Sequence, residues 1–481
     1  MIYSFGRFRL DAAARRLTRG SSAIALGDRH LEVLLRLLAQ PGEIVPKEAL
    51  VQAAWPDVAV TDNSLEQVIS LLRRTIAARE GGDHGLAIET VPRRGYRLTG
   101  EVACETSKHS DAEVDAMLAP HRAWLEGRAA LETLAVQHVG AAEQAFALVL
   151  EAAPHHPTAR VGLANALVFR FEASRVDESP DVIALATALT HAREACRMDP
   201  KWAESWATLG FVLHRAGQLE HGIAAVHRAV ELEPDNWRHH LRLAFVAWGE
   251  LRLRAAQRTL HLMPGLGLAH WLAASVHVAR QAFDAAEHEL AVGRTAQDEQ
   301  RAGAAFGSVG LHWLSGLLCL AQGDAAAAER HFDRELGFEE SGHLYARECS
   351  AATWYAKGAL ALTAGNQDQA AAAFNEVVRR IPRHPLALAA LAGLGLSDER
   401  ELAARLERAA ERGAHVDVAV ANAVRDAARR ESADAIPVRA ALQAAPPGPS
   451  GWFLPVEPIL RPVADPAKWS PTLTLLRTRA G

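Results

Sequence analysis

The 481-residue sequence contains only four cysteines, four methionines and four tyrosines. The cysteines, at positions 104, 196, 319 and 349, form no C-x-x-C pair, so neither a disulfide framework nor a zinc knuckle is predicted. No run approaches the roughly 20 apolar residues of a membrane helix, and the start, MIYSFGRFRLD, lacks the basic and apolar regions of a signal peptide. We therefore expect reduced thiols, no membrane contact and a cytoplasmic protein.

Motifs of catalysis and metal binding are also missing. The sequence has no P-loop, no G-x-G-x-x-G after a strand, no H-E-x-x-H and no G-x-S-x-G elbow, so no enzyme, catalytic residue or cofactor is predicted. Its 22 histidines, including His155-His156 and His239-His240, suggest a metal or pH sensor. Because no H-x-x-x-H with a nearby third ligand stands out, we favour surface histidines on polar helix faces and expect no metal.

Abundant alanine and an ordinary apolar content of 49% favour packed helices, and the fold class we expect is mainly α. The length predicts two to four domains or one elongated repeat array. Residues 1–102 contain 14 Lys and Arg against 12 Asp and Glu, whereas the remainder contains 38 against 45. A basic surface on the first segment must therefore come from the placement of charge rather than from its amount.

Residues 1–102 alternate short strand-like runs with helical patterns. Residues 3–10 and 17–26 favour strands, the second with a turn at Arg19-Gly20-Ser21. Helices are predicted from Leu31 to the Pro41-Gly42 stop, from about Lys47 to Trp55, and from Asn63 to about Arg79. Asn63 and Glu66 have the spacing of a capping box. In the third helix Leu65, Ile69, Leu72 and Ile76 form one apolar face, which places Asn63, Gln67, Ser70 and Arg74 on the opposite side.

Residues 88–98 read as two strands about a turn that carries Arg93 and Arg94. Strands, three helices and a basic hairpin, in this order, are typical of a winged helix-turn-helix. The segments LGDRHLEVL (26–34), EALVQAAW (48–55), NSLEQVISLLRR (63–74) and ETVPRRGY (89–96) resemble the DNA-binding domain of the OmpR/PhoB family of response regulators. The resemblance covers about residues 1–100 and implies an α+β winged helix that binds double-stranded DNA.

The resemblance also has departures. The module opens the chain and leaves no room for a receiver domain before it, so phosphorelay control is not expected. The arrangement is similar to CadC- and ToxR-like regulators, in which the winged helix comes first, but without their membrane helix. Ser70 and Leu71 stand where family members often carry arginines, so base preference cannot be transferred. Weaker intrinsic affinity would then be offset by two copies pairing on neighbouring half-sites, and we expect a homodimer on DNA.

Residues 103–118 are polar and are predicted to form a linker, followed by helical repeats over 119–444. The repeats resemble the tetratricopeptide family, whose period is about 34 residues. The clearest copy has its markers at Trp206, Leu209, Gly210, Gly217, Ala229 and Pro234. Weaker copies have theirs at Trp124, Ala142, Phe146 and Pro154; at Gly316, Gly323, Ala328 and Phe332; and at Gly358, Gly365, Ala370, Phe374 and Pro382. Such an array implies a solenoid whose groove takes a protein or peptide partner.

Two features of the repeat region have competing interpretations. The 11 tryptophans suggest an aromatic pocket, but most, including Trp206 and Trp354, lie at repeat packing positions and favour a core role. Residues 445–481 are rich in proline and could form a disordered tail. Because Trp452 and Phe453 lie among the prolines, we instead expect an extended segment packed along the array, followed by a short final helix over 471–479.

The predicted DNA-binding residues lie on the third helix and the hairpin tip. Asn63, Gln67 and Arg74 would contact base edges in the major groove, with Ser64 and Ser70 as short-range donors. Arg73 would grip phosphate, and the family resemblance implies that Arg93 and Arg94 reach the minor groove or its phosphates. The alternative is that all of these residues form merely a solvated helix face and a solvated turn.

The leading hypothesis is a one-component transcription factor of bacterial type whose repeats receive a signal. The alternative is a tetratricopeptide scaffold whose winged helix no longer reads DNA. Retention of both basic pairs, Arg73-Arg74 and Arg93-Arg94, favours DNA binding. A repeat sensor tied to an ATPase is excluded because nucleotide-binding motifs are absent.

Overall fold

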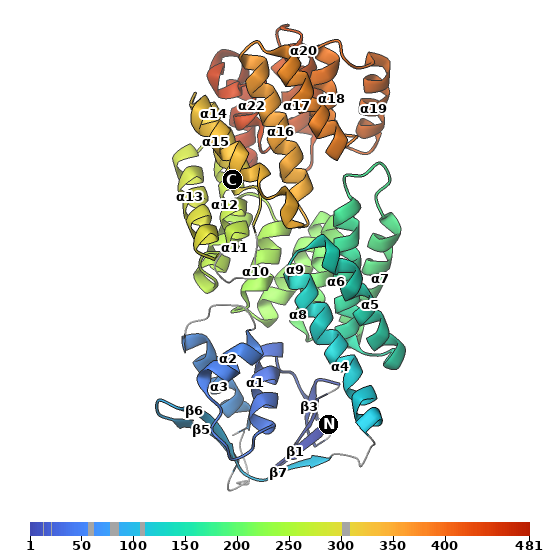
Figure 1. Cartoon of the computed structure of the whole chain (residues 1–481), viewed down its shortest axis with the longest axis vertical. Coiled ribbons are helices and arrows are strands. Elements are labelled where there is room, and N and C mark those ends of the chain that lie inside the picture. The colour runs from blue at the N-terminus through green and yellow to red at the C-terminus, as the bar shows by residue number, and fades with distance from the viewer. Residues whose placement is uncertain (13, 21, 56–61, 77–85, 106–110, 301–307) are drawn as a thin grey trace.

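The chain forms a small α+β domain at one end of an elongated stack of helices (Figure 1). The computed structural model describes residues 1–481 except residues 13, 21, 56–61, 77–85, 106–110 and 301–307. The fold class expected from the sequence, a winged helix followed by a helical solenoid, is confirmed by this arrangement. No helix in the described part of the chain combines the length and apolar character that crossing a bilayer requires.

The first domain contains a five-stranded antiparallel sheet, three helices and a separate hairpin. The sheet has the strand order β4-β3-β2-β1-β7, and β5 and β6 pair with each other. The elements are β1 (Ile2–Phe5), β2 (Phe8–Asp11), β3 (Arg16–Arg19), β4 (Ser22–Ile24), α1 (Asp28–Leu38), α2 (Lys47–Ala54), α3 (Asp62–Ile76), β5 (Ala87–Val91), β6 (Gly95–Thr99) and β7 (Val102–Glu105). The strand-like run over residues 3–10 is thus two strands, joined at Gly6, whose φ of 55° permits the tight turn.

The predicted linker over residues 103–118 differs from the structure at both ends. Residues 102–105 form β7 and pair with β1, with Tyr3 opposite Cys104. Helix α4 already begins at Asp111. Polar residues are compatible with an edge strand and with the start of a helix, and composition alone could not distinguish these from a linker. Residues 106–110, the centre of the predicted linker, lie outside the described residues.

Seven helical hairpins follow in the described part of the chain, and four of them contain the repeat copies named from the sequence. The pairs are α4 (Asp111–Glu132) with α5 (Val136–Ala152), α6 (Pro157–Ser174) with α7 (Val182–Met198), α8 (Ala203–Arg215) with α9 (Leu219–Leu232), α10 (Trp237–Val246) with α11 (Gly249–Leu262), α12 (Gly267–Ala279) with α13 (Phe283–Gln300), α14 (Leu311–Ala321) with α15 (Ala325–Leu336), and α16 (Ala346–Thr363) with α17 (Gln367–Arg380). The stack continues through α18 (Pro385–Gly393), α19 (Glu399–Glu411), α20 (His415–Ala428) and α21 (Ala435–Ala444).

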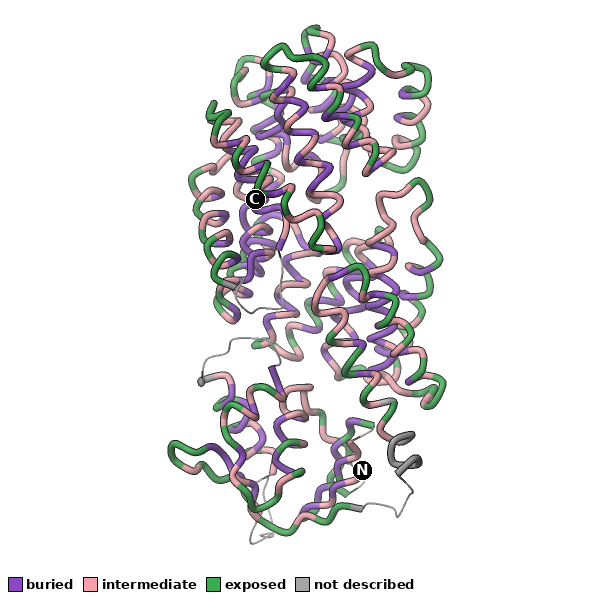
Figure 2. The backbone as a smooth tube through the Cα atoms, viewed as in Figure 1, coloured by how far each residue is buried: buried purple, intermediate pink, exposed green. Residues whose placement is uncertain are grey.

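A glycine facing a phenylalanine closes several of these hairpins. A Cβ added at Gly316 would lie 2.3 Å from Cε1 of Phe332, and one added at Gly358 would lie 2.5 Å from Cε1 of Phe374. Both phenylalanines are buried, and Figure 2 shows buried residues following the facing sides of the helices. The small residues predicted at repeat markers therefore let paired helices approach closely. Trp206 and Trp354 are half-buried at their repeat positions.

The proline-rich C-terminal segment packs back along the stack, as expected. Trp452 meets Trp271 and Trp313 edge-on, with ring centroids 5.6 and 6.2 Å apart. The segment includes two short 3-10 turns, η2 (Leu454–Val456) and η3 (Pro462–Ala464), before α22 (Pro466–Arg479). The final helix begins five residues earlier than predicted, because Asp465 caps it and Pro466 occupies its first position.

The winged helix packs directly against the repeats. Trp237, Met263 and Leu266 share one hydrophobic cluster with the core of the winged helix. From the winged helix, the Arg15 guanidinium lies 4.3 Å from the ring centroid of Trp124 in α4. Arg29 is half-buried beside Arg238 and Arg128, and loss of solvent followed by repulsion from these two groups lowers its pKa to about 9. This junction holds the DNA-binding module against one end of the array.

Candidate DNA-binding site

Helix α3 is positioned by its apolar face. Leu65, Val68, Ile69 and Leu72 are buried against the domain core, as the helical spacing predicted, with Ile76 partly buried at the end. The helix begins at Asp62, so Asn63 lies inside it rather than at the predicted cap. The side chain of Asn63 lies outside the described residues, as do residues 77–79 at the predicted end of the helix.

The opposite face of α3 carries a row of exposed polar side chains. Gln67, Ser70 and Arg74 are exposed, and Ser64 is partly buried at the start of the same side. Their spacing of three and four residues places them on one face of the helix. Arg74 forms no hydrogen bond or ion pair within the described part of the chain. The repeats do not cover this row, so its amide, hydroxyl and guanidinium groups are available to a ligand.

The β5–β6 hairpin forms the wing beside α3 and projects from the domain (Figure 1). Arg93 and Arg94 lie exposed in its turn, where the Arg94 amide donates to the Val91 carbonyl at 3.0 Å. Directly after this turn, Gly95 fits where a Cβ would lie 2.1 Å from the Val45 carbonyl oxygen. The sequence thus correctly placed both arginines at the tip of a hairpin.

Arg73 has a role that the sequence did not suggest. Its Nε donates to the Ile88 carbonyl at 2.7 Å, and its Nη2 donates to the Thr90 hydroxyl at 2.7 Å. Its guanidinium carbon also lies 6.0 Å from the ring centroid of Tyr96. These contacts tie α3 to both strands of the wing and set the angle between the two DNA-facing elements. The phosphate contact predicted for Arg73 stays a prediction.

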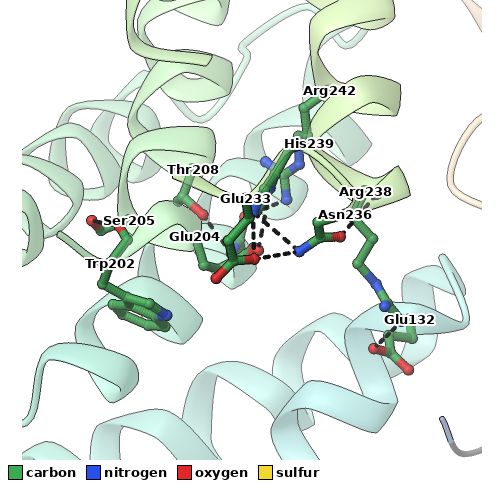
Figure 3. Close-up of polar contacts among 11 residues, drawn as sticks. Glu132, Trp202, Glu204, Ser205, Thr208, Glu233, Asn236, Arg238, His239 and Arg242 are labelled. Carbon is green, nitrogen blue, oxygen red and sulfur yellow. Dashed lines mark hydrogen bonds and ion pairs between the residues drawn. The ribbon is translucent and has the colours of Figure 1, made fainter. Parts of the chain in front are cut away.

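A partly buried polar network lies near the junction, at the turn between α9 and α10 (Figure 3). His239 and Asn236 contact one oxygen of Glu233, at 3.1 and 2.8 Å. Burial acts to raise the pKa of Glu233, but its bonds to His239 and Asn236 outweigh burial and lower it. Arg238, in the first turn of α10, forms an ion pair with Glu132 of α4, in which Nη2 and Oε1 lie 2.8 Å apart.

The expectation that the histidines are surface residues is wrong for His239 and His240. Both are buried, and each ring has a polar partner that makes burial tolerable. His239 contacts Glu233, and the Nε2 of His240 lies 2.8 Å from the Pro234 carbonyl oxygen. These contacts brace the α9–α10 turn. Within the described residues, no three His, Cys, Asp or Glu side chains are grouped so that they could hold a metal ion.

Comparison with known families supports the assignment of the first domain. Residues 21–98 match the family described as "Transcriptional regulatory protein, C terminal". This match confirms the OmpR/PhoB-type resemblance of the N-terminal segment. The matched span contains α1 to α3 and the wing, and so all of the predicted DNA-binding residues.

Two curated relatives share this part of the chain. The "Cholera toxin homolog transcriptional activator" of Vibrio parahaemolyticus is 31% identical over 97 residues, which are 19% of this chain and 32% of the relative. The "Transcriptional activator CadC" of Escherichia coli is 27% identical over 97 residues, 20% of this chain and 19% of the relative. The chain therefore spans a third or less of the length of either relative.

Solved structures of both kinds of domain show some similarity to the chain. The DNA-binding domain of Escherichia coli CadC is 25% identical, with a TM-score of 0.20, and covers 21% of this chain and 94% of its own. A thermophilic TPR protein of Thermus thermophilus is 17% identical, with a TM-score of 0.29, and covers 36% of this chain and 88% of its own. The repeat architecture is established by the helical hairpins themselves rather than by these scores.

Proposed function

We propose that this protein is a DNA-binding transcriptional regulator of the one-component type, whose helical repeats receive a protein or peptide partner. The observation that carries the proposal is the exposed row Gln67, Ser70 and Arg74 on α3 next to the exposed wing arginines Arg93 and Arg94. Amide and guanidinium groups suit base edges in the major groove, and arginines at a wing tip suit phosphates or the minor groove. The match of residues 21–98 to a transcriptional regulatory family supports it.

The proposal assigns different tasks to the residues of the site. Gln67 and Arg74, together with Asn63, contact bases, and Ser64 and Ser70 add short hydrogen bonds. Arg93 and Arg94 bind the DNA backbone beside the groove that α3 enters. Arg73 holds the wing at its working angle, and its outer face adds a phosphate contact. Two copies pair on neighbouring half-sites, because one module of this size contacts only a short stretch of DNA.

The test is genome-wide occupancy of the intact protein and of the triple variant Arg74→Ala/Arg93→Ala/Arg94→Ala. A matched control removes three exposed arginines from the far end of the array: Arg400→Ala/Arg408→Ala/Arg412→Ala. Both variants lose the same charge, so a general electrostatic effect would weaken them equally. We expect discrete peaks with a shared motif that only the first variant loses.

Binding to the recovered operator gives the physical readout. The logarithm of affinity should fall with the logarithm of salt concentration, and the slope should shrink by about 0.9 for each substituted arginine that contacts a phosphate. No peaks from a folded protein, or equal loss in both variants, would favour the alternative that the winged helix belongs to an interaction scaffold. Sedimentation showing a monomer both free and on the operator would remove the dimer.

A further inference from the structure

The connection between α15 and α16 is longer than most of the connections that join successive hairpins. Five of the connections that join successive hairpins have four residues each: 153–156, 199–202, 233–236, 263–266 and 381–384. The connection between α15 and α16 has nine, residues 337–345, including a 3-10 turn, η1 (Glu339–Ser341). Stacking of helical hairpins therefore does not require its length. We call residues 339–345 of this connection the strap.

The strap pairs with the first hairpin of the array, about 200 residues earlier in the chain. The Leu344 amide donates to the Leu134 carbonyl at 2.7 Å, and the Val136 amide donates to the Gly342 carbonyl at 2.9 Å. These bonds flank an antiparallel bridge between Ala135 and His343. The strap is extended only at this bridge, since Gly342 before it has a left-handed φ of 70° and a turn follows. Its two bonds to the α4–α5 turn involve backbone atoms alone, so a partner peptide that takes the same path would form them as well.

Side chains of the strap enter a site built by α6 and α10. Leu344 is buried, and the Tyr345 ring stacks on Phe245 of α10 with centroids 6.2 Å apart. The Tyr345 hydroxyl donates to Oε2 of Glu172, a carboxylate whose side chain is fully buried in α6. Arg215 of α8 lies 2.7 Å from the same carboxylate. The ring of Phe245 and a buried carboxylate that accepts a hydrogen bond from the hydroxyl together recognise a tyrosine.

We propose that the strap is an intramolecular ligand of this inner face, and that an extended partner peptide carrying adjacent leucine and tyrosine displaces it. The proposal rests on the proposed role of the repeats in receiving a partner and names the site and the chemistry of that partner. In the free chain the strap occupies the site, since a tethered segment competes at an effective concentration of about millimolar.

Helix α10 would transmit displacement of the strap to the winged helix, because it contacts both. This helix carries Phe245 beneath Tyr345 near one end, and Trp237 in the winged-helix cluster at the other. Helix α4 makes a second connection, because the α4–α5 turn pairs with the strap while Trp124 lies under Arg15 of the winged helix. Two helices, α10 and α4 with the turn that follows it, therefore contact both the strap and the winged helix.

The test uses the full chain and a fluorescent peptide with the sequence of residues 338–347. A Leu344→Ser/Tyr345→Ser variant empties the site, and we expect it to bind the peptide at least tenfold more tightly than the unaltered protein does. A peptide with serine in place of both side chains should not bind. A cooperative melting transition and an unchanged helical circular-dichroism spectrum show that the variant is folded, although the loss of two packed side chains should lower its melting temperature.

A reversible lock provides the matched control. Adding Ala135→Cys and His343→Cys to the open variant places a cysteine pair at the bridge, where antiparallel partners flanked by such bonds lie about 4.5 Å apart at Cα, within disulfide range. Oxidation should abolish peptide binding and reduction should restore it. Binding that persists after oxidation, or an open variant that binds no more tightly than the unaltered protein, would overturn the proposal.

A measurement on the unaltered protein avoids any folding defect of a variant. Excess peptide should make the Leu344 amide exchange its hydrogen faster, while the Val136 amide stays protected because the peptide takes the place of the strap. Unchanged exchange at Leu344 under saturating peptide would contradict displacement. Operator binding is measured separately, so failure of the strap proposal and failure of DNA binding are distinguishable.

Discussion

Two neighbouring arginines on α3 should respond to substitution in opposite ways. Arg73 donates two hydrogen bonds of 2.7 Å to the wing, whereas Arg74 is exposed on the DNA-facing row. Arg73→Ala should therefore loosen the wing. Arg74→Ala should leave the domain intact and weaken DNA binding. The pair is matched in charge, residue type and helix position.

The size of the effect follows from the bonds that are lost. A hydrogen bond contributes about 0.5–1.5 kcal/mol net, and more when one partner is charged. Arg73 is partly exposed, and solvent weakens its charged hydrogen bonds, so values at the lower end of that range apply. We therefore expect Arg73→Ala to lower the free energy that holds the wing against α3 by about 1–3 kcal/mol. That loss corresponds to a roughly 5- to 150-fold fall in the protection of wing amides against hydrogen exchange.

The assay is hydrogen exchange of β5 and β6 in the two variants and the unaltered protein, together with operator affinity. We expect Arg73→Ala to lose protection in the wing and affinity together, and Arg74→Ala to lose affinity alone. Equal protection in both variants would refute the reasoning, because it would mean that the Arg73 contacts do not hold the wing.

Three further predictions concern stability and the junction. Gly162→Ala should lower the melting temperature, because a Cβ there meets Phe146 at 2.2 Å and overpacking costs about 1–3 kcal/mol; Gly140→Ala, with open space around it, should not. Burial raises the pKa of Glu457 to about 7, against 4.5 in the unfolded chain. The melting temperature should therefore fall as the pH rises from about 4.5 to above 7, and Glu457→Gln should make it less dependent on pH over this interval. Trp237→Ala should free the winged helix, seen as a larger radius of gyration by small-angle scattering, while operator affinity changes less than threefold because the exposed row of α3 is untouched.

Much of the architecture could be predicted because it rests on local periodicity. The apolar spacing of Leu65, Ile69 and Leu72 defined the buried face of α3 and therefore its exposed face. Likewise, Gly358 and Phe374 recur at repeat positions, since a hairpin closes only where a small residue faces a large one. The β1–β7 pairing takes residues 103–105 out of the predicted linker, and no local pattern reports it because it joins residues about 100 positions apart.

The candidate site divides in the same way. Arg93 and Arg94 were placed by the turn between two strand patterns, which is a local signal. The hydrogen bonds of Arg73 to the wing form only if α3 lies close enough to β5, and that distance is set by the packing of the domain core. The nine-residue connection over 337–345 could have signalled the strap by its length alone, but not where it lies.

The sequence by itself determined the winged helix, the helical character of the repeats and the row of polar side chains on α3. Those features depend on residues within one helix, one turn or one repeat period, where spacing dictates which side is buried. Only the tertiary structure decided the docking of Trp237 beside the winged helix and the entry of Tyr345 between α6 and α10. Both depend on the accumulated rotation of successive hairpins, which brings distant segments together and is set by packing at every interface of the stack.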